Sequence, residues 1–180
     1  MEPDAKAARW QTGNFTEFFE LASPYMVRLG YLLLGERAAA EDIAQDVLEQ
    51  VYKRWPSLRE DSLLAYAHAA VVNRARSVGR RRAVANKFSA ILATPEFSAD
   101  DQVGDPWLWR HVQSLPRRQR EVVVLRYWCD LTEAEIAKVL GVSAGTVKSS
   151  AHRALAQLGR AVREGAAVVN GDATANREEA

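Results

Sequence analysis

Apolar side chains recur every three or four residues along most of this sequence, and the alternating runs typical of β-strands are missing. The segment AAAEDIAQDVLEQVYKRW, residues 38–55, is the clearest case. Its apolar residues fall on one side of a helix, and Pro56 follows directly and predicts its end. The side predicted to face a core holds Ile43, Val47, Leu48, Val51 and Tyr52. This periodicity predicts an all-α protein.

Further helices are predicted on both sides of that segment. Residues 15–35 predict two helical pieces, because Ser23 followed by Pro24 is typical of an N-cap and a first helical turn. The second piece is predicted to stop at Gly35, and another helix to start near Ser62. The C-terminal half then predicts a series of helices in which Pro residues and hydroxyl caps mark the starts.

The local charge changes sign sharply near the middle of the chain. Residues 62–95 contain no Asp or Glu but carry several cations, whereas PEFSADDQVGDP, residues 95–106, is acidic and rich in helix-breaking residues. This shift predicts a flexible acidic linker between two small helical domains. The predicted segments are a flexible N-terminus (1–14), a first domain (15–83), the linker (84–106), a second domain (107–165) and a flexible tail (166–180).

Composition and motif content limit the classes of function that this chain can have. The formal net charge is +1, so total charge indicates no partner, and the single cysteine, Cys129, excludes an internal disulfide and fits a reducing, cytoplasmic location. No signal peptide or membrane-crossing run is recognisable, so no membrane contact is expected. The three histidines lie on separate predicted elements, and no phosphate-binding loop or metal-ligand spacing occurs. We therefore expect no enzymatic activity, no cofactor and no small-molecule substrate.

Residues 132–158 have the pattern of a helix-turn-helix. Thr132 and Glu135 match a capping box at the start of one helix. Gly141 suits the left-handed residue that ends it, and Ser143 can cap the next helix. The second helix is predicted to bury Val147, Ala151, Leu155 and Leu158. Its outward face is predicted to carry Gly145, Lys148, Ser149, His152 and Arg153. Such a face is typical of binding in the major groove of DNA, and an ordinary solvated face is the alternative.

A second cationic stretch, NRARSVGRRR at residues 73–82, indicates another anionic partner. Trp55, Tyr66 and His68 lie upstream of it, and aromatic rings beside a cationic track are what single-stranded DNA binding requires. A solvated basic face and a helix on a membrane surface are the alternatives. The apolar residues opposite the cations are only valines, which disfavours the membrane.

These features, in this order, resemble the sigma-70 family, in its short extracytoplasmic-function group of bacterial transcription initiation factors, and in particular its actinobacterial members. The resemblance runs from about Phe15 to Arg163. The phrases that carry it are SPYMVRLGYLLLGERAAAEDIAQDVLEQVYKRW, NRARSVGRRR and LPRRQREVVVLRYWCDLTEAEIAKVLGVSAGTVKSSAHRALAQL. It implies a factor that binds the clamp helices and flap of core RNA polymerase and directs the enzyme to promoter DNA. An anti-sigma protein is a further expected partner.

The resemblance also implies roles for particular residues. The first domain would be the family's region 2, which binds core polymerase through Asp42, Gln45, Asp46 and Glu49. This acidic and polar stripe suits a basic partner, with a solvated face as the alternative. The −10 element, as duplex and as melted non-template strand, would be bound by Trp55, Arg59, Asn73, Arg74, Arg76, Arg80 and Arg81. The second domain would be region 4, which binds the −35 element through Thr132, Ser143, Gly145, Thr146, Lys148, Ser149, His152 and Arg153. Melting would need no ATP.

A stand-alone helix-turn-helix regulator is the main alternative function. It would explain residues 116–158 equally well, but it leaves the acidic stripe and the acid-free basic segment without a role. A protein that serves only as an interaction module would not explain the cations of the second helix.

Overall fold

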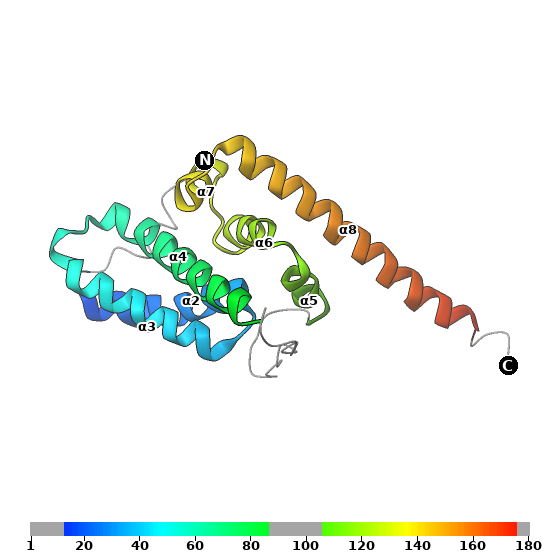
Figure 1. Ribbon diagram of the computed structural model, residues 1–180, viewed down its shortest axis with the longest axis horizontal. Coiled ribbons are helices and arrows are strands. Elements are labelled where there is room, and N and C mark those ends of the chain that lie inside the picture. Colours follow the sequence, from blue (N-terminus) through cyan, green and yellow to red (C-terminus); the bar gives the residue numbers. More distant parts are fainter. Residues whose placement is uncertain (1–12, 87–105, 176–180) are drawn as a thin grey trace.

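Helices account for all the regular structure in the computed structural model, which describes residues 13–86 and 106–175 (Figure 1). In chain order they are α2 (Phe15–Leu34), α3 (Arg37–Arg54), the 3₁₀ turn η1 (Trp55–Ser57), α4 (Glu60–Asn86), α5 (Pro106–Ser114), α6 (Arg117–Val123), the π-helical turn η2 (Val124–Trp128), α7 (Glu133–Leu140) and α8 (Ala144–Ala175). We call α2 to α4 the N-terminal bundle and α5 to α8 the C-terminal unit. The predicted all-α class is confirmed. The predicted flexible linker and N-terminal segment lie almost wholly outside the described residues.

α2 is one continuous helix rather than two pieces. It begins after Asn14, whose side-chain oxygen accepts a 3.0 Å hydrogen bond from the Glu17 backbone N–H. Pro24 lies inside the helix and removes one helical hydrogen bond. The predicted break is wrong because apolar residues before and after Pro24 share one buried face, so that tertiary packing outweighs the local cost. The predicted end is confirmed, because Gly35 caps the helix in the left-handed conformation, with φ of 76°.

The N-terminal bundle packs α2, α3 and α4 around a shared core. α2 and α3 approach closely at Gly30, where a Cβ atom would lie 3.1 Å from the Cα atom of Ala40. His68 on α4 is buried in this core, and its Nε2 lies 2.7 Å from a tyrosine hydroxyl of α2. Tyr52, predicted to face the core, is instead 62% exposed, because its ring packs on Phe15 at the bundle surface with centroids 4.8 Å apart.

The C-terminal unit contains the predicted helix-turn-helix. Thr132 and Glu135 form the predicted capping box, and Gly141 ends α7 in the left-handed conformation with φ of 65°. Ser143 then caps α8, because its hydroxyl oxygen accepts a 3.2 Å hydrogen bond from the Thr146 backbone N–H. The start, turn and second start predicted for the motif are all confirmed.

α8 extends well beyond the helix-turn-helix, and Figure 1 shows it projecting away from the rest of the molecule. The helix continues as far as Ala175, into the segment from residue 166 that the sequence predicts as a flexible tail, and the flexibility of that segment stays a prediction. The predicted buried stripe is wrong at Leu155, which is 46% exposed, whereas Ser150 and Ala154 are buried. Residues four apart drift around a helix of 3.6 residues per turn, so the buried face shifts from Leu155 to Ala154.

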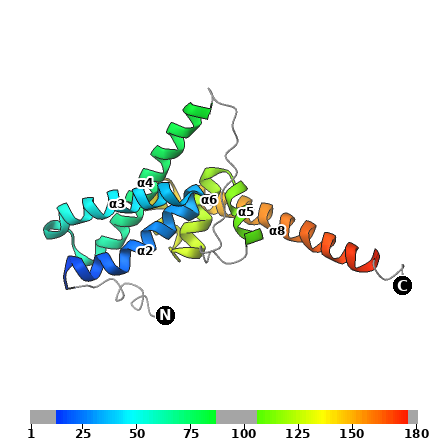
Figure 2. The same ribbon diagram turned by 90° about the horizontal axis from the view of Figure 1, so that it is seen from below.

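The N-terminal bundle and the C-terminal unit pack against each other (Figures 1 and 2). Tyr25 of α2 stacks on Trp128, with ring centroids 4.5 Å apart, and Tyr31 of α2 stacks on Trp109 of α5 at 5.4 Å. One buried cluster contains residues from both parts of the chain. We call this packing the closed arrangement. It brings together surfaces that the sequence predicts to lie on separate domains.

Candidate functional site

The outward face of α8 has the exposure that DNA contact requires. Its exposed residues are Gly145, Thr146, Lys148, Ser149, His152 and Arg153. Val147 and Ala151 are buried and turn these residues toward the surface. The Arg153 side chain lies along the helix, because its Nε donates a 3.2 Å hydrogen bond to the Ser149 carbonyl oxygen. Cations and hydroxyls arranged in this way can donate hydrogen bonds to base edges and to phosphates.

The hydroxyl groups at the two helix starts are engaged within the protein. The Thr132 hydroxyl and backbone N–H donate to the Glu135 carboxylate at 2.6 and 2.7 Å. The hydroxyl oxygens of Ser143 and Thr146 lie 2.9 Å apart. These side chains therefore position the helix starts, and the remaining first-turn N–H groups are suited to a phosphate.

The basic part of α4 carries both exposed and paired residues. Asn73, Arg80 and Arg81 are exposed, and Arg80 donates a 2.9 Å hydrogen bond to a serine hydroxyl one turn back on α4. Arg74 pairs with Asp46 of α3, with 3.3 Å between Nη1 and the carboxylate oxygen. Both side chains of this pair are about half exposed. An exposed ion pair contributes little to stability, so Arg74 can exchange Asp46 for another anion.

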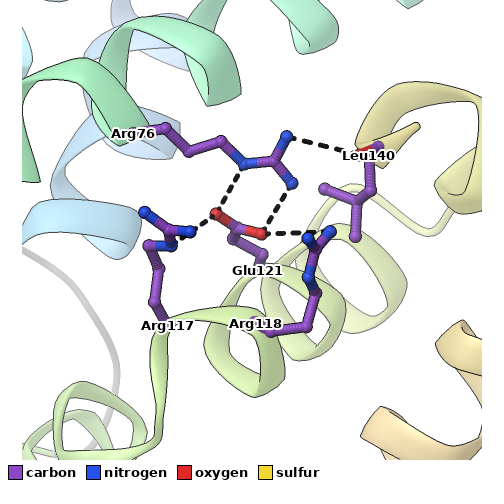
Figure 3. A network of polar contacts seen from close by, with 5 residues as sticks. All are labelled: Arg76, Arg117, Arg118, Glu121 and Leu140. Carbon is purple, nitrogen blue, oxygen red and sulfur yellow. Dashed lines mark hydrogen bonds and ion pairs between the residues drawn. The ribbon is translucent and has the colours of Figure 1, made fainter. Parts of the chain in front are cut away.

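Arg76 differs from these neighbours because its side chain is only 14% exposed and reaches the C-terminal unit (Figure 3). Its Nε and Nη2 donate hydrogen bonds of 2.9 and 2.8 Å to the two carboxylate oxygens of Glu121 on α6. Its Nη1 donates a 3.3 Å hydrogen bond to the Leu140 carbonyl oxygen at the end of α7. In the closed arrangement Arg76 is therefore engaged by a carboxylate 45 residues away, and its predicted contact with DNA stays a prediction.

Several guanidinium groups surround the Glu121 carboxylate. Arg117 Nε lies 3.6 Å and Arg118 Nη1 lies 3.8 Å from its oxygens. The hydrogen bonds that Arg76 donates to Glu121 raise the pKa of Arg76, against the opposing effect of burial. Burial lowers the pKa of Arg120, which donates 2.8 Å hydrogen bonds to α5 instead. Sequence reasoning missed this cluster because no local pattern pairs α4 with α6.

The segment between α3 and α4 contains the predicted DNA contacts Trp55 and Arg59. Trp55 is half-buried, and its ring centroid lies 5.4 Å from those of Phe15 and Phe18 on α2. Arg59 is exposed. Packing on α2 therefore orients the segment through Trp55, while Arg59 lies at the surface.

The predicted stripe on α3 lies on the surface. All four of its residues are exposed, namely Asp42, Gln45, Asp46 and Glu49. The opposite face of α3 is buried in the bundle core, which turns the stripe outward. Glu49 pairs with Lys53 one turn later, and this hydrogen bond lowers the pKa of Glu49. The stripe thus presents negative charge that a basic protein surface can match.

Beside this stripe lies an apolar groove of about 500 Å³ that sequence reasoning missed. Its apolar lining includes Phe15, Phe19, Val27, Leu48 and Tyr52. Phe19 is 44% exposed, and two stripe residues, Gln45 and Glu49, form a polar edge. Exposed aromatic rings beside charged residues are typical of protein–protein contact surfaces. The sequence signal that could have predicted this groove is the pair Phe15 and Phe19, which lie four residues apart outside the buried stripe of α2.

Two other kinds of feature are absent from the part of the chain that the structure describes. None of its helices combines the length and apolar character needed to span a bilayer. No cluster of three or more His, Cys, Asp or Glu residues suited to a metal ion is found there either.

Two family models match the chain. The model described as "Sigma-70 region 2" matches residues 18–85, and the one described as "Sigma-70, region 4" matches residues 107–158. The first match covers most of the N-terminal bundle, and the second covers the helix-turn-helix with the helices that support it.

Curated relatives and a solved structure extend the similarity. The RNA polymerase sigma-E factor of Streptomyces coelicolor is 34% identical over 148 residues, which are 81% of this chain and 84% of that protein. The ECF RNA polymerase sigma factor ShbA of Streptomyces griseus is 30% identical, over 76% and 78% of the two chains. The sigma factor RpoE of Bartonella quintana, solved with the anti-sigma factor NepR, shares the fold with a TM-score of 0.72 at 22% identity, over 84% of this chain and 98% of that one.

Proposed function

The chain belongs to the sigma-70 family, in its extracytoplasmic-function group, and from that premise we propose how its surfaces direct transcription initiation. It binds core RNA polymerase, recognises two promoter elements and melts the −10 element. Residues 15–83 act as region 2, residues 107–165 act as region 4, and residues 84–106 join them. The observation that carries this proposal is that one chain presents both an acidic stripe on α3 and a cationic recognition face on α8.

We propose that core polymerase binds the N-terminal bundle at the α3 stripe. Asp42, Gln45, Asp46 and Glu49 give the contact its charge, and the clamp helices of the enzyme are the partner that the family resemblance implies. The adjoining apolar groove supplies buried area, through Phe19 and Tyr52. An apolar centre with charged surroundings is the usual composition of a specific protein interface. The C-terminal unit makes its own contact at the flap of the polymerase.

The C-terminal unit is proposed to bind the −35 element as duplex DNA. α8 enters the major groove, where Lys148, Ser149, His152 and Arg153 meet base edges and phosphates. Gly145 and Thr146 lie at the start of the same face. Thr132 and Ser143 fix the two helix starts, whose backbone N–H groups face the phosphates.

The N-terminal bundle is proposed to bind the −10 element and its melted non-template strand. The contacts are Trp55, Arg59, Asn73, Arg74, Arg80 and Arg81, together with Arg76 when it leaves Glu121. Extruding a base from the duplex costs a few kcal/mol, which binding to these residues must offset. Melting then runs on binding energy, without ATP or another cofactor.

The chain is proposed to act only by binding, in the cytoplasm, with no catalysis and no small-molecule substrate. A protein inhibitor is a further proposed partner. The Bartonella quintana RpoE structure, which shares this fold, contains the anti-sigma factor NepR, and this supports a partner of that kind.

A stand-alone regulator is not favoured, because the two matched regions cover both halves of the chain. A gel shift with and without core polymerase separates the two functions. A sigma factor binds promoter DNA tightly only when core polymerase is present. Tight binding of duplex DNA by the isolated chain would instead support the regulator.

Arg153→Ala is expected to weaken binding at particular base pairs of the −35 element by about 1–3 kcal/mol. The guanidinium lies on the exposed face of α8, where a bidentate hydrogen bond to a guanine can be made. The measurement is binding of the polymerase holoenzyme to a panel of promoters with single changes in the −35 element.

Arg160→Ala is the matched control, because Arg160 is an exposed arginine two turns later on the same helix. It should leave the base preferences unchanged. A uniform loss across the whole panel for Arg153→Ala would mean that Arg153 binds a phosphate and reads no base.

A further inference from the structure

One predicted DNA contact is held by the protein itself. Arg76 is the only member of the predicted −10 set on α4 that reaches across to the C-terminal unit among the described contacts. The Glu121 carboxylate accepts hydrogen bonds from Nε and Nη2 of Arg76 (Figure 3). This is the bidentate geometry in which an arginine also binds a phosphate. Both side chains are shielded from water, at 14% and 4% exposure. A carboxylate bound in this way can substitute for a phosphate on the guanidinium.

The closed arrangement is also too small to bind both promoter elements at once. The −10 and −35 elements lie about 25 base pairs apart, or about 85 Å along B-form DNA at roughly 3.4 Å per base pair. A compact body of about 150 residues, which leaves out the projecting part of α8, has a radius of gyration of about 15 Å. The two predicted DNA surfaces lie on α4 and on the first turns of α8, within one packed body. They must separate before a single chain can reach both elements.

We propose that the Arg76–Glu121 ion pair is an autoinhibitory contact, in which Glu121 replaces a DNA phosphate on Arg76 and stabilises the closed arrangement until polymerase and promoter draw the two parts of the chain apart. This inference rests on the proposed promoter-binding function. It assigns to Glu121 a role that does not involve touching DNA or polymerase. It also means that Arg76 becomes available to the −10 element when the two parts of the chain separate.

The surroundings of Glu121 make the contact reversible. A buried carboxylate that loses its only cation is strongly destabilised. Glu121 keeps two cations when Arg76 leaves, because Arg117 and Arg118 lie on its own helix within 3.8 Å. Arg76 in turn gains the phosphates of the −10 strand. Both members of the pair therefore have another partner in the open form, which is what an exchangeable contact requires.

Opening must also separate the aromatic stacks between the two parts. Tyr25 with Trp128 and Tyr31 with Trp109 are lost together with the ion pair. The closed arrangement therefore lowers the apparent affinity for any partner that binds only the open form, in proportion to the small open fraction. Weakening the ion pair should raise that fraction.

The first test measures the distance between the two parts in the free, full-length chain. Spin labels are attached at Lys53→Cys on α3 and Arg160→Cys on α8, which are both exposed sites, while Cys129 is buried. Glu121→Gln removes the charge and keeps the shape. It is expected to raise the ratio of long to short distances by about tenfold or more in electron–electron double resonance, because the hydrogen bonds to a charged partner are weakened. Glu133→Gln is the matched control, because it breaks a partly exposed ion pair with Arg126 inside the C-terminal unit.

The second test measures binding of a fluorescent 20-nucleotide single-stranded DNA of mixed sequence at low salt. Glu121→Gln is expected to bind it several-fold more tightly than the unmodified chain, because Arg76 is released. Arg76→Gln should show the same lengthening of the distances with no gain in DNA binding. Circular dichroism checks that each variant stays helical. If Glu121→Gln unfolds, the spin-label distances in Arg76→Gln show whether the ion pair holds the chain closed.

Two results would overturn the inference. Distances that stay unchanged in both variants would mean that the ion pair does not hold the chain closed. Equal DNA affinity for Glu121→Gln and Glu133→Gln would mean that Glu121 does not mask Arg76. Failure of the proposed function looks different, since the distances would respond as expected while the chain did not copurify with core polymerase.

Discussion

Replacing Asp46 with arginine is expected to abolish assembly of the chain with core RNA polymerase. Asp46 lies in the middle of the exposed stripe on α3, so the substitution changes the local charge by two units at the centre of the proposed interface. Like charges facing each other across an interface cost several kcal/mol, and about 3 kcal/mol corresponds to a loss of roughly a hundredfold in affinity. The measurement is copurification with core polymerase, followed by a titration that gives Kd.

Asp46 also pairs with Arg74, so the loss of that pair must be separated from the loss of polymerase binding. The exchange Asp46→Arg with Arg74→Asp restores opposite charges between α3 and α4 and should still fail to bind polymerase. Glu20→Arg reverses an exposed acid of α2 outside the stripe and should bind normally. Unchanged copurification of the Asp46→Arg chain would remove the assignment of this stripe to polymerase.

Phe18→Ala is expected to reduce the free energy of unfolding by about 3–5 kcal/mol. The Phe18 side chain on α2 is fully buried, and its ring centroid lies 5.4 Å from that of Trp55 in the segment after α3. Its removal leaves a cavity beside the Trp55 ring. The measurement is thermal or urea unfolding followed by circular dichroism.

The next residue provides the matched control for this prediction. Phe19 carries the same side chain on the same turn of α2 but is 44% exposed in the apolar groove. Phe19→Ala should cost less than about 1 kcal/mol, as is usual for surface positions. It should nevertheless weaken polymerase binding if the groove belongs to that interface. Equal destabilisation by the two substitutions would contradict the packing of α2 described above.

Local signals in the sequence were enough to predict most helix boundaries. The Thr132–Glu135 capping box, the left-handed Gly141 and the Ser143 cap depend only on residues within four positions of one another, and all three are confirmed. The helix break predicted at Pro24 is wrong because a proline destabilises a helix only locally. The packing of α2 on α3 and α4 buries one face of the whole helix and outweighs that local cost. The burial predicted for Leu155 is wrong because residues spaced strictly by four gradually leave one face of a helix with 3.6 residues per turn.

Long-range pairing accounts for what the sequence could not predict about the candidate site. The exposure of the α8 face and of the α3 stripe follows from helical periodicity and is as predicted. The environment of Arg76 does not follow from helical periodicity, because its partner Glu121 lies on another helix and meets it only in the tertiary structure. The apolar groove was missed for the same reason, since Phe19 and Tyr52 meet only when α2 packs on α3.

Run-off transcription with purified core polymerase tests the central claim most directly. The template carries a promoter found by sequencing the DNA that the reconstituted holoenzyme retains from the genome encoding this chain. The account predicts a discrete transcript that requires both the chain and the core enzyme, starts at one position and is lost with Asp46→Arg. A transcript pattern that is identical with and without the chain, when the chain is folded and present in excess, would contradict the account.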